Sequence, residues 1–309
     1  MIRKAVFSYF NPDESFGNKC GFVWYSDFLY TTALSVLCAS RQFREVQFIS
    51  SDWGLDMITQ LKLPITSYSD KLNEMKSISK FFWAYGKMLA YCEQTTPFVH
   101  IDNDVFLWEP LPKRILNARL CFQSHEPFDK PGYIYYNILK ECWAKAPVRP
   151  KIILDNEVTD FAYNCGIAGG HDLDIFQEHL KTSAAYIFAE KNQKLFFQQF
   201  GNILIHQNLF HEQYFLACLI KKHGLRKEVK VLHKDALEIP NRYKFTHLWG
   251  TTKTDKGIMA RVKLRLRDED RALFDRVETF CKKNNVDEEN SFPSKRKTVQ
   301  PVADIIRAH

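Results

Sequence analysis

The sequence predicts an α/β fold in which helices flank a mixed, mostly parallel sheet. Strand-like and helix-like segments alternate through the first hundred residues, which is typical of βαβ units. A short apolar run at 98–101 is followed at once by two carboxylates, Asp102 and Asp104. In open α/β sheets, ligands bind outside the carboxyl ends of the strands, so these two side chains lie where a site is expected.

The first half of the chain contains regular elements that follow one another closely. The apolar run 5–10 predicts a strand, and helical spacing of apolar residues predicts a helix over 27–43 with Ser26 or Asp27 as its N-cap. The same patterns predict, in order, strand 45–49, helix 52–61, strand 65–68, helix 77–94 and strand 98–101.

The second half is less regular. Its expected elements are, in order, strand 119–124, a loop at 145–151, a strand from 161 that runs into Gly169 and Gly170, a long helix to about 199, helix 212–222, and strands 230–232 and 246–249. Beyond Gly257 the pattern predicts one charged helix to about 283 and then a polar, disordered stretch at 284–297. We therefore expect one domain over residues 1–256 and a charged helical extension with a disordered tail over 257–309.

Composition indicates a globular cytoplasmic protein. Hydrophobic residues make up 45% of the 309 residues, and no stretch of about 18 uncharged apolar residues predicts a membrane span. The chain enters its first strand directly, without the apolar core of a signal peptide. Eight cysteines are scattered without a Cys-x-x-Cys pair, which favours reduced thiols over a disulfide framework or a zinc site.

The charge of the chain favours anionic ligands. Lys and Arg number 43 against 36 Asp and Glu, a formal net charge of +7, which suits a sugar nucleotide or an anionic membrane surface. The excess falls short of a nucleic-acid-binding footprint, so we expect no nucleic-acid partner. For the basic helix at 257–283 two interpretations stay open: a solvated charged face, or peripheral contact with the inner face of a membrane or with a partner.

The acidic triplet Asp102-Asn103-Asp104 has a functional and a local interpretation. Two carboxylates one residue apart suit a hard divalent cation, which keeps several waters and binds substrate phosphates as well. Asp and Asn are also ordinary turn residues after a strand. The apolar runs on both sides, 98–101 and 105–108, hold the triplet between buried segments and favour a cation site for a nucleotide or nucleotide-sugar substrate.

With its motifs in this order, the sequence resembles glycosyltransferases of the GT-A fold, especially the glycogenin-like and galactosyltransferase-like families, over about residues 3–255. Four landmarks carry the resemblance: Asp102-Asn103-Asp104, Asn164-Cys165-Gly166, Glu212-Gln213, and His247 with Gly250 and Lys253. The resemblance implies a GT-A-type, Rossmann-like mixed sheet in a single domain. It also implies transfer of a sugar from a nucleoside-diphosphate sugar, with a UDP-sugar expected, to a glycan, peptide or lipid-linked acceptor.

The resemblance also implies roles for individual residues. Asp102, Asp104 and His247 would bind Mn²⁺ or Mg²⁺, and imidazole suits manganese better than magnesium. The residues expected at the donor are Tyr9, Lys80, Asp102, Asn103, Gly166, Gly250 and Lys253. The catalytic residues near the transferred sugar are expected to be Asn164, Glu212 and Gln213. Each has a local alternative: a core histidine, a tight turn, a surface lysine, a core tyrosine or a carboxylate at a helix start.

The sequence departs from the family pattern at two places, and two rival functions remain as alternatives to this interpretation. The chain has Thr254-Asp255 where the glycogenin-like pattern often has Pro-Trp, and Glu212 where Asp is commoner. A nucleotidyltransferase would need a glycine-rich basic loop after the first strand, but residues 11–19 contain one glycine and one lysine. A non-catalytic nucleotide- or carbohydrate-binding protein is the other rival, and the presence of both Asp102 and Asp104 favours catalysis.

Overall fold

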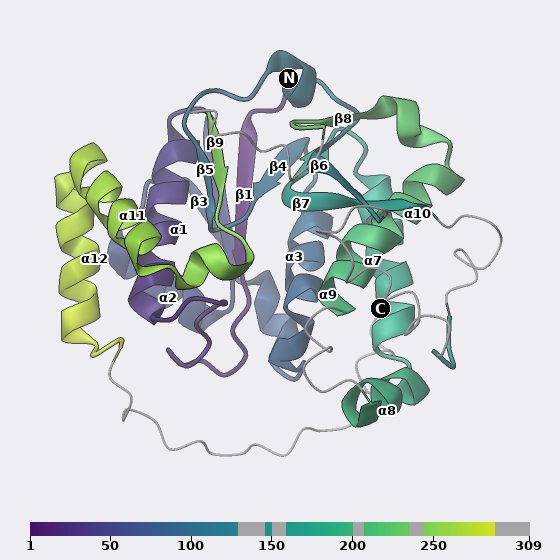
Figure 1. Cartoon of the computed structure of the whole chain (residues 1–309), viewed down its shortest axis with the longest axis horizontal. Coiled ribbons are helices and arrows are strands. Elements are labelled where there is room, and N and C mark those ends of the chain that lie inside the picture. Colours follow the sequence, from purple (N-terminus) through teal and green to yellow (C-terminus); the bar gives the residue numbers. More distant parts are fainter. Residues whose placement is uncertain (129–145, 150–158, 200–206, 235–243, 288–309) are drawn as a thin grey trace. The chain divides into compact units, whose positions relative to one another are not determined.

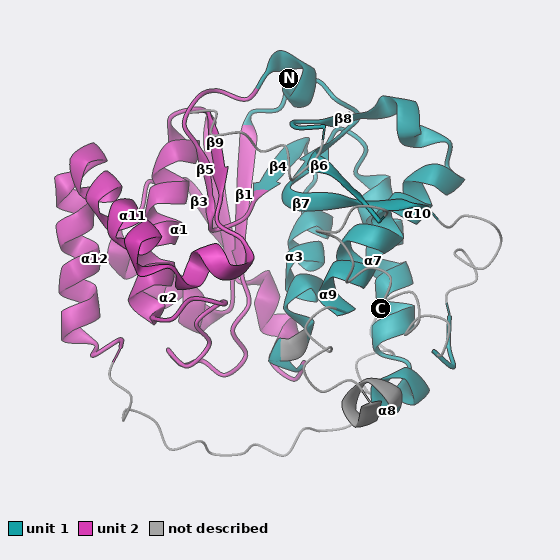
Figure 2. Ribbon diagram, viewed as in Figure 1, with its two compact units in different colours: residues 1–3, 79–100, 112–242 teal, residues 4–78, 101–111, 243–309 magenta. Residues whose placement is uncertain are grey.

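The computed structural model describes residues 1–128, 146–149, 159–199, 207–234 and 244–287 (Figure 1). The chain divides into two compact units, each assembled from segments distant in sequence (Figure 2). Unit 1 comprises residues 1–3, 79–100 and 112–242, and unit 2 comprises residues 4–78, 101–111 and 243–309. Each unit is described by itself.

Unit 2 contains a parallel three-stranded arrangement in the order β3-β2-β1, and its strands are β1 (Lys4–Tyr9), β2 (Glu45–Ser50) and β3 (Ser67–Ser69). Its helices and short helical turns are α1 (Tyr25–Ser40), α2 (Asp52–Leu61), η1 (Lys71–Met75), η8 (Gly250–Thr254), α11 (Lys256–Glu269) and α12 (Arg271–Lys283). Helix α1 is buried along almost its whole length, and both α11 and α12 contact it. A helix that is buried on all sides needs such cover, because every face of it is removed from water.

Unit 2 also holds the antiparallel pair β5 (Val105–Leu107) and β9 (Phe245–His247). The register pairs Val105 with His247 and Leu107 with Phe245. This pair joins the segment after the acidic triplet to a segment near the end of the described chain.

Unit 1 contains strands in the order β4-β7-β6-β8: β4 (Phe98–Ile101), β6 (Leu120–Pro127), β7 (Phe161–Gly170) and β8 (Val229–Val231). Strand β6 pairs antiparallel with β7, with a bulge between Phe122 and Ser124, and parallel with β8. The helical segments are η2 (Lys80–Phe82), α3 (Trp83–Cys92), α4 (Lys113–Leu116), α7 (Asp174–Ile187), α8 (Glu190–Gln199), α9 (Gln207–Leu209), η5 (Phe210–Tyr214), α10 (Phe215–Lys222) and η6 (Leu225–Glu228).

The predicted α/β class, with a mixed sheet and flanking helices, is confirmed. Gly169 shows how closely the strands of unit 1 approach, since a Cβ atom there would lie 2.1 Å from the Phe98 carbonyl oxygen. Only glycine therefore fits at this position of β7.

Three expected helices differ from the structure. The helix expected from residue 77 begins at Trp83, after 3₁₀ turns. The long helix expected to about 199 is interrupted between Ile187 and Glu190. The single helix expected after residue 257 breaks at Asp270, whose side chain accepts a hydrogen bond from the Leu273 backbone nitrogen and so caps a second helix.

The predicted cap of α1 was wrong. Its N-cap is Trp24, whose side chain makes no capping hydrogen bond, and the Ser26 backbone nitrogen in the first turn donates instead to the Asp287 carboxylate at 3.0 Å. Asp27 lies inside the helix, buried, where its carboxylate forms an ion pair of 2.7 Å with Lys263 of α11. Burial of a carboxylate requires such a partner, so Asp27 joins two helices instead of starting one.

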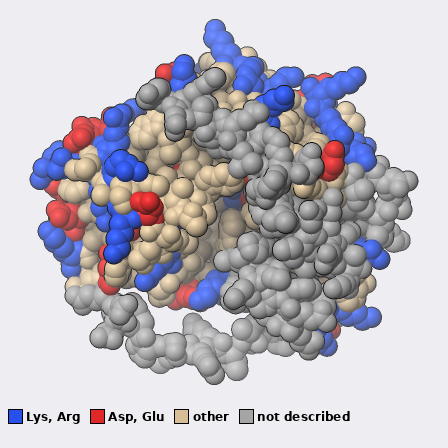
Figure 3. Space-filling view, viewed as in Figure 1, with Lys and Arg blue, Asp and Glu red and all other residues tan. Residues whose placement is uncertain are grey.

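The charged C-terminal helices have mixed surfaces. Basic and acidic side chains are interleaved over α11 and α12 (Figure 3), and i,i+4 ion pairs join Arg265 to Glu269 and Arg271 to Asp275. This favours the solvated-face interpretation, and nothing in the described residues supports membrane docking. The domain boundary at residue 256 stays a prediction, and most of the tail expected to be disordered (288–297) lies outside the described residues.

Two bulk features complete the description. Within the described ranges, the seven cysteines are free thiols. The helices in those ranges are all too short or too polar to cross a bilayer. The expected loop at 145–151 lies partly outside the described residues.

Candidate functional site

The acidic triplet is held rigidly between β4 and β5. The Asp102 carbonyl accepts hydrogen bonds from the Val105 backbone nitrogen at 3.0 Å and from the Ser35 hydroxyl of α1 at 3.2 Å. The Asn103 side-chain nitrogen donates to the Ser8 carbonyl, at the end of β1, at 2.8 Å. These bonds hold the backbone of the triplet in place between the two strands.

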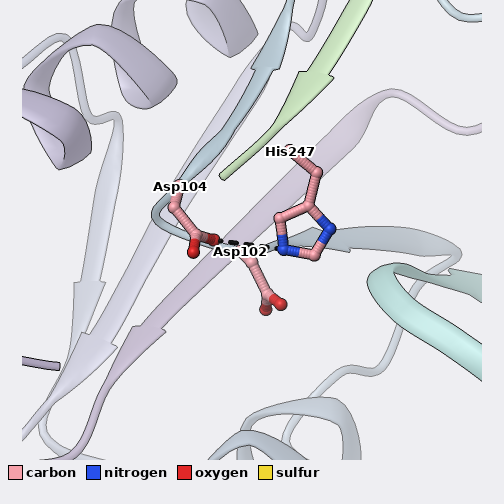
Figure 4. A group of neighbouring side chains, drawn as sticks. All are labelled: Asp102, Asp104 and His247. Carbon is pink, nitrogen blue, oxygen red and sulfur yellow. Dashed lines mark ion pairs between the residues drawn. The ribbon is translucent and has the colours of Figure 1, made fainter. Parts of the chain in front are cut away.

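The antiparallel pair β5–β9 brings His247 to the triplet. His247 lies opposite Val105 in the ladder, and the Leu248 backbone nitrogen donates to the Asp104 carbonyl at 3.0 Å. The imidazole Nε2 is 3.5 Å from Asp104 Oδ1 (Figure 4). Ligand atoms of Asp102, Asp104 and His247 all lie within 4.8 Å of one another.

Lys253 lies against the same carboxylates. It belongs to the 3₁₀ turn η8, which begins at Gly250 with a φ of +55°, a left-handed conformation that favours glycine. The Lys253 Nζ is 2.6 Å from Asp104 Oδ2 and 3.4 Å from the Cys20 carbonyl. It also lies 5.2 Å from the centroid of the Phe22 ring, within the range of a cation–π contact.

The electrostatics of this cluster favour charged side chains. Burial alone would raise the pKa of Asp104, but the positive charge of Lys253 and the hydrogen bonds from Lys253 and His247 outweigh it, and the pKa lies well below the usual value. Burial would lower the pKa of Lys253, but the charge and hydrogen bond of Asp104, with a contribution from Asp102, raise it. Asp104 is therefore a carboxylate and Lys253 an ammonium.

The side chains of Asp102, Asp104 and His247 are suitable ligands for a divalent cation. Two carboxylates and an imidazole are accepted by Mn²⁺, and carboxylates by Mg²⁺. Asp104 and His247 are nearly buried, with 7% and 9% of their side chains exposed, whereas Asp102 is half-buried. Asp104 and His247 are thus fixed ligands, whereas Asp102 faces solvent. On that side, water molecules and phosphate oxygens can complete the coordination shell of a divalent ion.

Two other expected donor residues also lie in unit 2. Asn103 Oδ1 is buried and has no hydrogen-bond partner among the described residues, and the role of Asn103 at the donor stays a prediction. Tyr9 is 3% exposed, its ring lies 4.7 Å from that of Phe28, and its hydroxyl is 3.0 Å from the Tyr25 hydroxyl. These contacts are those of a core tyrosine, and base stacking on Tyr9 stays a prediction.

A second polar cluster lies inside unit 1, around Glu212. Its Oε1 is 2.8 Å from Nζ of Lys87, and the two side chains are 1% and 6% exposed. The Lys87 ammonium also donates to the Cys165 carbonyl of β7 at 2.7 Å. Sequence reasoning missed Lys87, although a lysine within the apolar stretch of α3 signals that a buried carboxylate must lie opposite.

Asn164 belongs to the same unit and is buried. Its side-chain nitrogen donates to Glu126 of β6 at 2.6 Å, and its Oδ1 accepts from the Gly166 backbone nitrogen at 2.9 Å. Glu126 was also missed by sequence reasoning. The expected pair Asn164 and Gly166 is therefore one hydrogen-bonded unit at the middle of β7.

Glu212 and Gln213 lie in η5, which is a π-helical segment. Such segments are rare and often occur at functional sites, because the wider turn redirects side chains. Both residues are buried. Lys80 lies exposed in η2 of the same unit, and its role at the donor stays a prediction.

The structure thus defines an α/β protein with a candidate cation site in one unit and a buried polar cluster in the other. The chain belongs to a protein family of unknown function, DUF6734, whose model matches residues 3–280. No curated protein matches it.

Several solved glycosyltransferases are similar to the chain at low identity. GlyE of Streptococcus pneumoniae TIGR4 is 10% identical with a TM-score of 0.43, over 96% of this chain and 66% of GlyE. Mouse xyloside xylosyltransferase 1 is 9% identical with a TM-score of 0.36, over 75% and 85% of the two chains. Galactosyltransferase LgtC, in complex with donor and acceptor sugar analogs, is 13% identical with a TM-score of 0.41, over 86% and 100%. The chain spans about two thirds of the length of GlyE.

Proposed function

We propose that this protein is a metal-dependent glycosyltransferase that moves a sugar from a nucleoside-diphosphate sugar, a UDP-sugar in particular, to an acceptor hydroxyl. The observation that carries the proposal is the Asp102, Asp104 and His247 cluster, whose ligand atoms lie within 4.8 Å of one another although β9 is far from the triplet in sequence. Lys253 adds a cationic side chain next to it. The order of the four motifs supports the same conclusion.

Several residues of the chain would together bind the leaving diphosphate. Asp102, Asp104 and His247 would hold Mn²⁺ or Mg²⁺, which when bound supplies Lewis-acid stabilisation of the departing diphosphate. The Lys253 ammonium would donate hydrogen bonds to the same phosphates, as a mobile positive charge. Gly250 permits the backbone turn that starts η8, and Asn103 offers a buried acceptor to the donor.

We propose separately that the polar cluster of unit 1, taken by itself, binds a sugar. Glu212, Gln213 and Asn164 offer a carboxylate and two amides, which are the groups that orient sugar hydroxyls by hydrogen bonds. Lys87 holds the Glu212 carboxylate in one position at 2.8 Å. A buried, fixed acceptor of this kind orients a hydroxyl without the entropic cost of ordering a surface side chain.

Nucleotide binding tests the proposal. We would measure thermal shifts of the wild type with a panel of nucleoside diphosphates and their sugar conjugates, with and without Mn²⁺. Asp104→Asn removes one ligand charge, and Asp268→Asn, at an exposed position of α11, serves as the matched control. We expect one nucleotide to raise the melting temperature in the presence of metal, in the wild type and Asp268→Asn but not in Asp104→Asn.

Product analysis separates the rival functions. A glycosyltransferase incubated with its donor and Mn²⁺ releases the nucleoside diphosphate, even slowly to water, whereas a nucleotidyltransferase releases or consumes pyrophosphate. We expect diphosphate release, reduced at least about a hundredfold in Asp104→Asn. Nucleotide binding without turnover in the presence of acceptor glycans, peptides and lipid-linked sugars would favour the non-catalytic binding protein.

A further inference from the structure

Both oxygen atoms of the Asp104 carboxylate lie close to a nitrogen atom of another side chain. Oδ1 is 3.5 Å from the His247 imidazole and Oδ2 is 2.6 Å from the Lys253 ammonium. The ammonium therefore lies against Asp104, one of the two carboxylates of the candidate cation site, where it balances one of their two negative charges.

An ammonium in this position competes with a divalent ion. A metal bonds to a carboxylate oxygen at about 2.1 Å, so an ion on Asp104 would lie within a few Å of a Lys253 ammonium that remained 2.6 Å from the same carboxylate. Repulsion between charges so close in a partly buried site is strong. Either the ion binds weakly, or the ammonium must leave.

We propose that Lys253 is a built-in competitor for the divalent cation, which binds tightly only together with a ligand whose diphosphate draws the ammonium away from Asp104. The nature of that ligand rests on the function proposed above. Metal and nucleotide would then bind with strong mutual dependence, because each relieves a cost of binding the other.

The geometry lets Lys253 move while Asp104 stays fixed. Asp104 is 7% exposed and its backbone is bonded to Leu248, next to the β5–β9 ladder. Lys253 is 22% exposed and has a flexible four-carbon chain. Its contact with the Cys20 carbonyl, at 3.4 Å, is long for a hydrogen bond.

A purely structural counter-ion would behave in the opposite way. If Lys253 served only to hold Asp104 in place, its removal would loosen the site and weaken metal binding. A competitor predicts tighter metal binding after removal. The sign of the change therefore separates the two roles.

The test measures Mn²⁺ affinity by isothermal titration calorimetry without nucleotide. Lys253→Met keeps the length of the side chain and removes its charge. Lys256→Met, at the exposed start of α11, makes the same change in net charge three residues away. We expect Lys253→Met to bind Mn²⁺ about tenfold more tightly than the wild type, and Lys256→Met to match the wild type within about twofold. Circular dichroism confirms that both variants are folded.

A second titration adds UDP. In the wild type, UDP should tighten Mn²⁺ binding strongly, and in Lys253→Met it should do so much less. Equal or weaker Mn²⁺ binding by folded Lys253→Met, or none by either protein, overturns the proposal. Tighter binding by Lys253→Met with no effect of any nucleotide on the wild type would leave Lys253 a competitor for the cation while contradicting the coupling to a diphosphate and the donor on which it rests. If Lys253→Met does not fold, Lys253→Gln replaces it with the same expected sign.

Discussion

The buried ion pair of Lys87 and Glu212 leads to a quantitative prediction. Lys87→Met removes the ammonium that lies 2.8 Å from the Glu212 carboxylate, in a place where both side chains are almost fully buried, at 6% and 1% exposure. Because solvent cannot screen the remaining charge, breaking the pair should lower the free energy of unfolding by about 3–5 kcal/mol. Loss of the hydrogen bond to the Cys165 carbonyl adds about 1 kcal/mol. This is a large fraction of the roughly 5–15 kcal/mol that stabilises an ordinary domain.

Urea denaturation followed by tryptophan fluorescence measures the effect as a double-mutant cycle. Glu212→Met and the double variant Lys87→Met/Glu212→Met complete the cycle. Because the double variant leaves no unpaired charge, we expect it to be more stable than the sum of the single effects by about 2 kcal/mol. The exposed pair Lys282 and Glu278 of α12 serves as control and should show almost no coupling. Additive effects at Lys87 and Glu212 would refute the reasoning.

Three further predictions concern stability. Burial lowers the pKa of His179 to about 4. The contribution of the neutral imidazole to the free energy of unfolding is therefore complete above about pH 6.5 and is lost as the pH falls to about 4. Over this range the free energy of unfolding of the wild type, measured by denaturant titration, should fall by about 3 kcal/mol more than that of His179→Gln. Gly169→Ala places a Cβ 2.1 Å from the Phe98 carbonyl oxygen and should cost about 1–3 kcal/mol, and an unchanged melting temperature would contradict this contact. Asp270→Ala removes the capping hydrogen bond from the Leu273 backbone nitrogen and should lower the free energy of unfolding by about 1 kcal/mol. An unchanged free energy of unfolding would show that the cap is dispensable.

Local sequence patterns predicted most of the elements but fewer of their ends. Alternation of strands and helices and the apolar periods are local, so strands such as β2 and β4 were found within a residue or two. The breaks at 188–189 and at Asp270 were missed, although Asp270 is a good N-cap residue, because the charged pattern continues across it. Asp27 was misread as a cap because its partner Lys263 is distant in sequence.

The candidate site was predicted unevenly for the same reason. Asp102 and Asp104 follow a buried strand and could be identified from the residues alone. His247 and Lys253 were suggested by a resemblance, and what brings His247 to Asp104 is the pairing of β5 with β9, a long-range contact that no local pattern encodes. Lys87 was hidden in an apolar helix because its carboxylate partner cannot be seen from helical spacing.

The central claim is that Asp102, Asp104 and His247 bind a divalent cation together with a nucleoside diphosphate. Anomalous diffraction at the manganese edge, from crystals grown with Mn²⁺ and UDP, tests it most directly. We predict one strong anomalous peak within bonding distance of the two carboxylates and the imidazole, with diphosphate oxygens on its open side and the Lys253 ammonium moved from Asp104 onto the phosphates. Bound UDP with no manganese at these three side chains, or manganese bound elsewhere in the protein, would contradict the account.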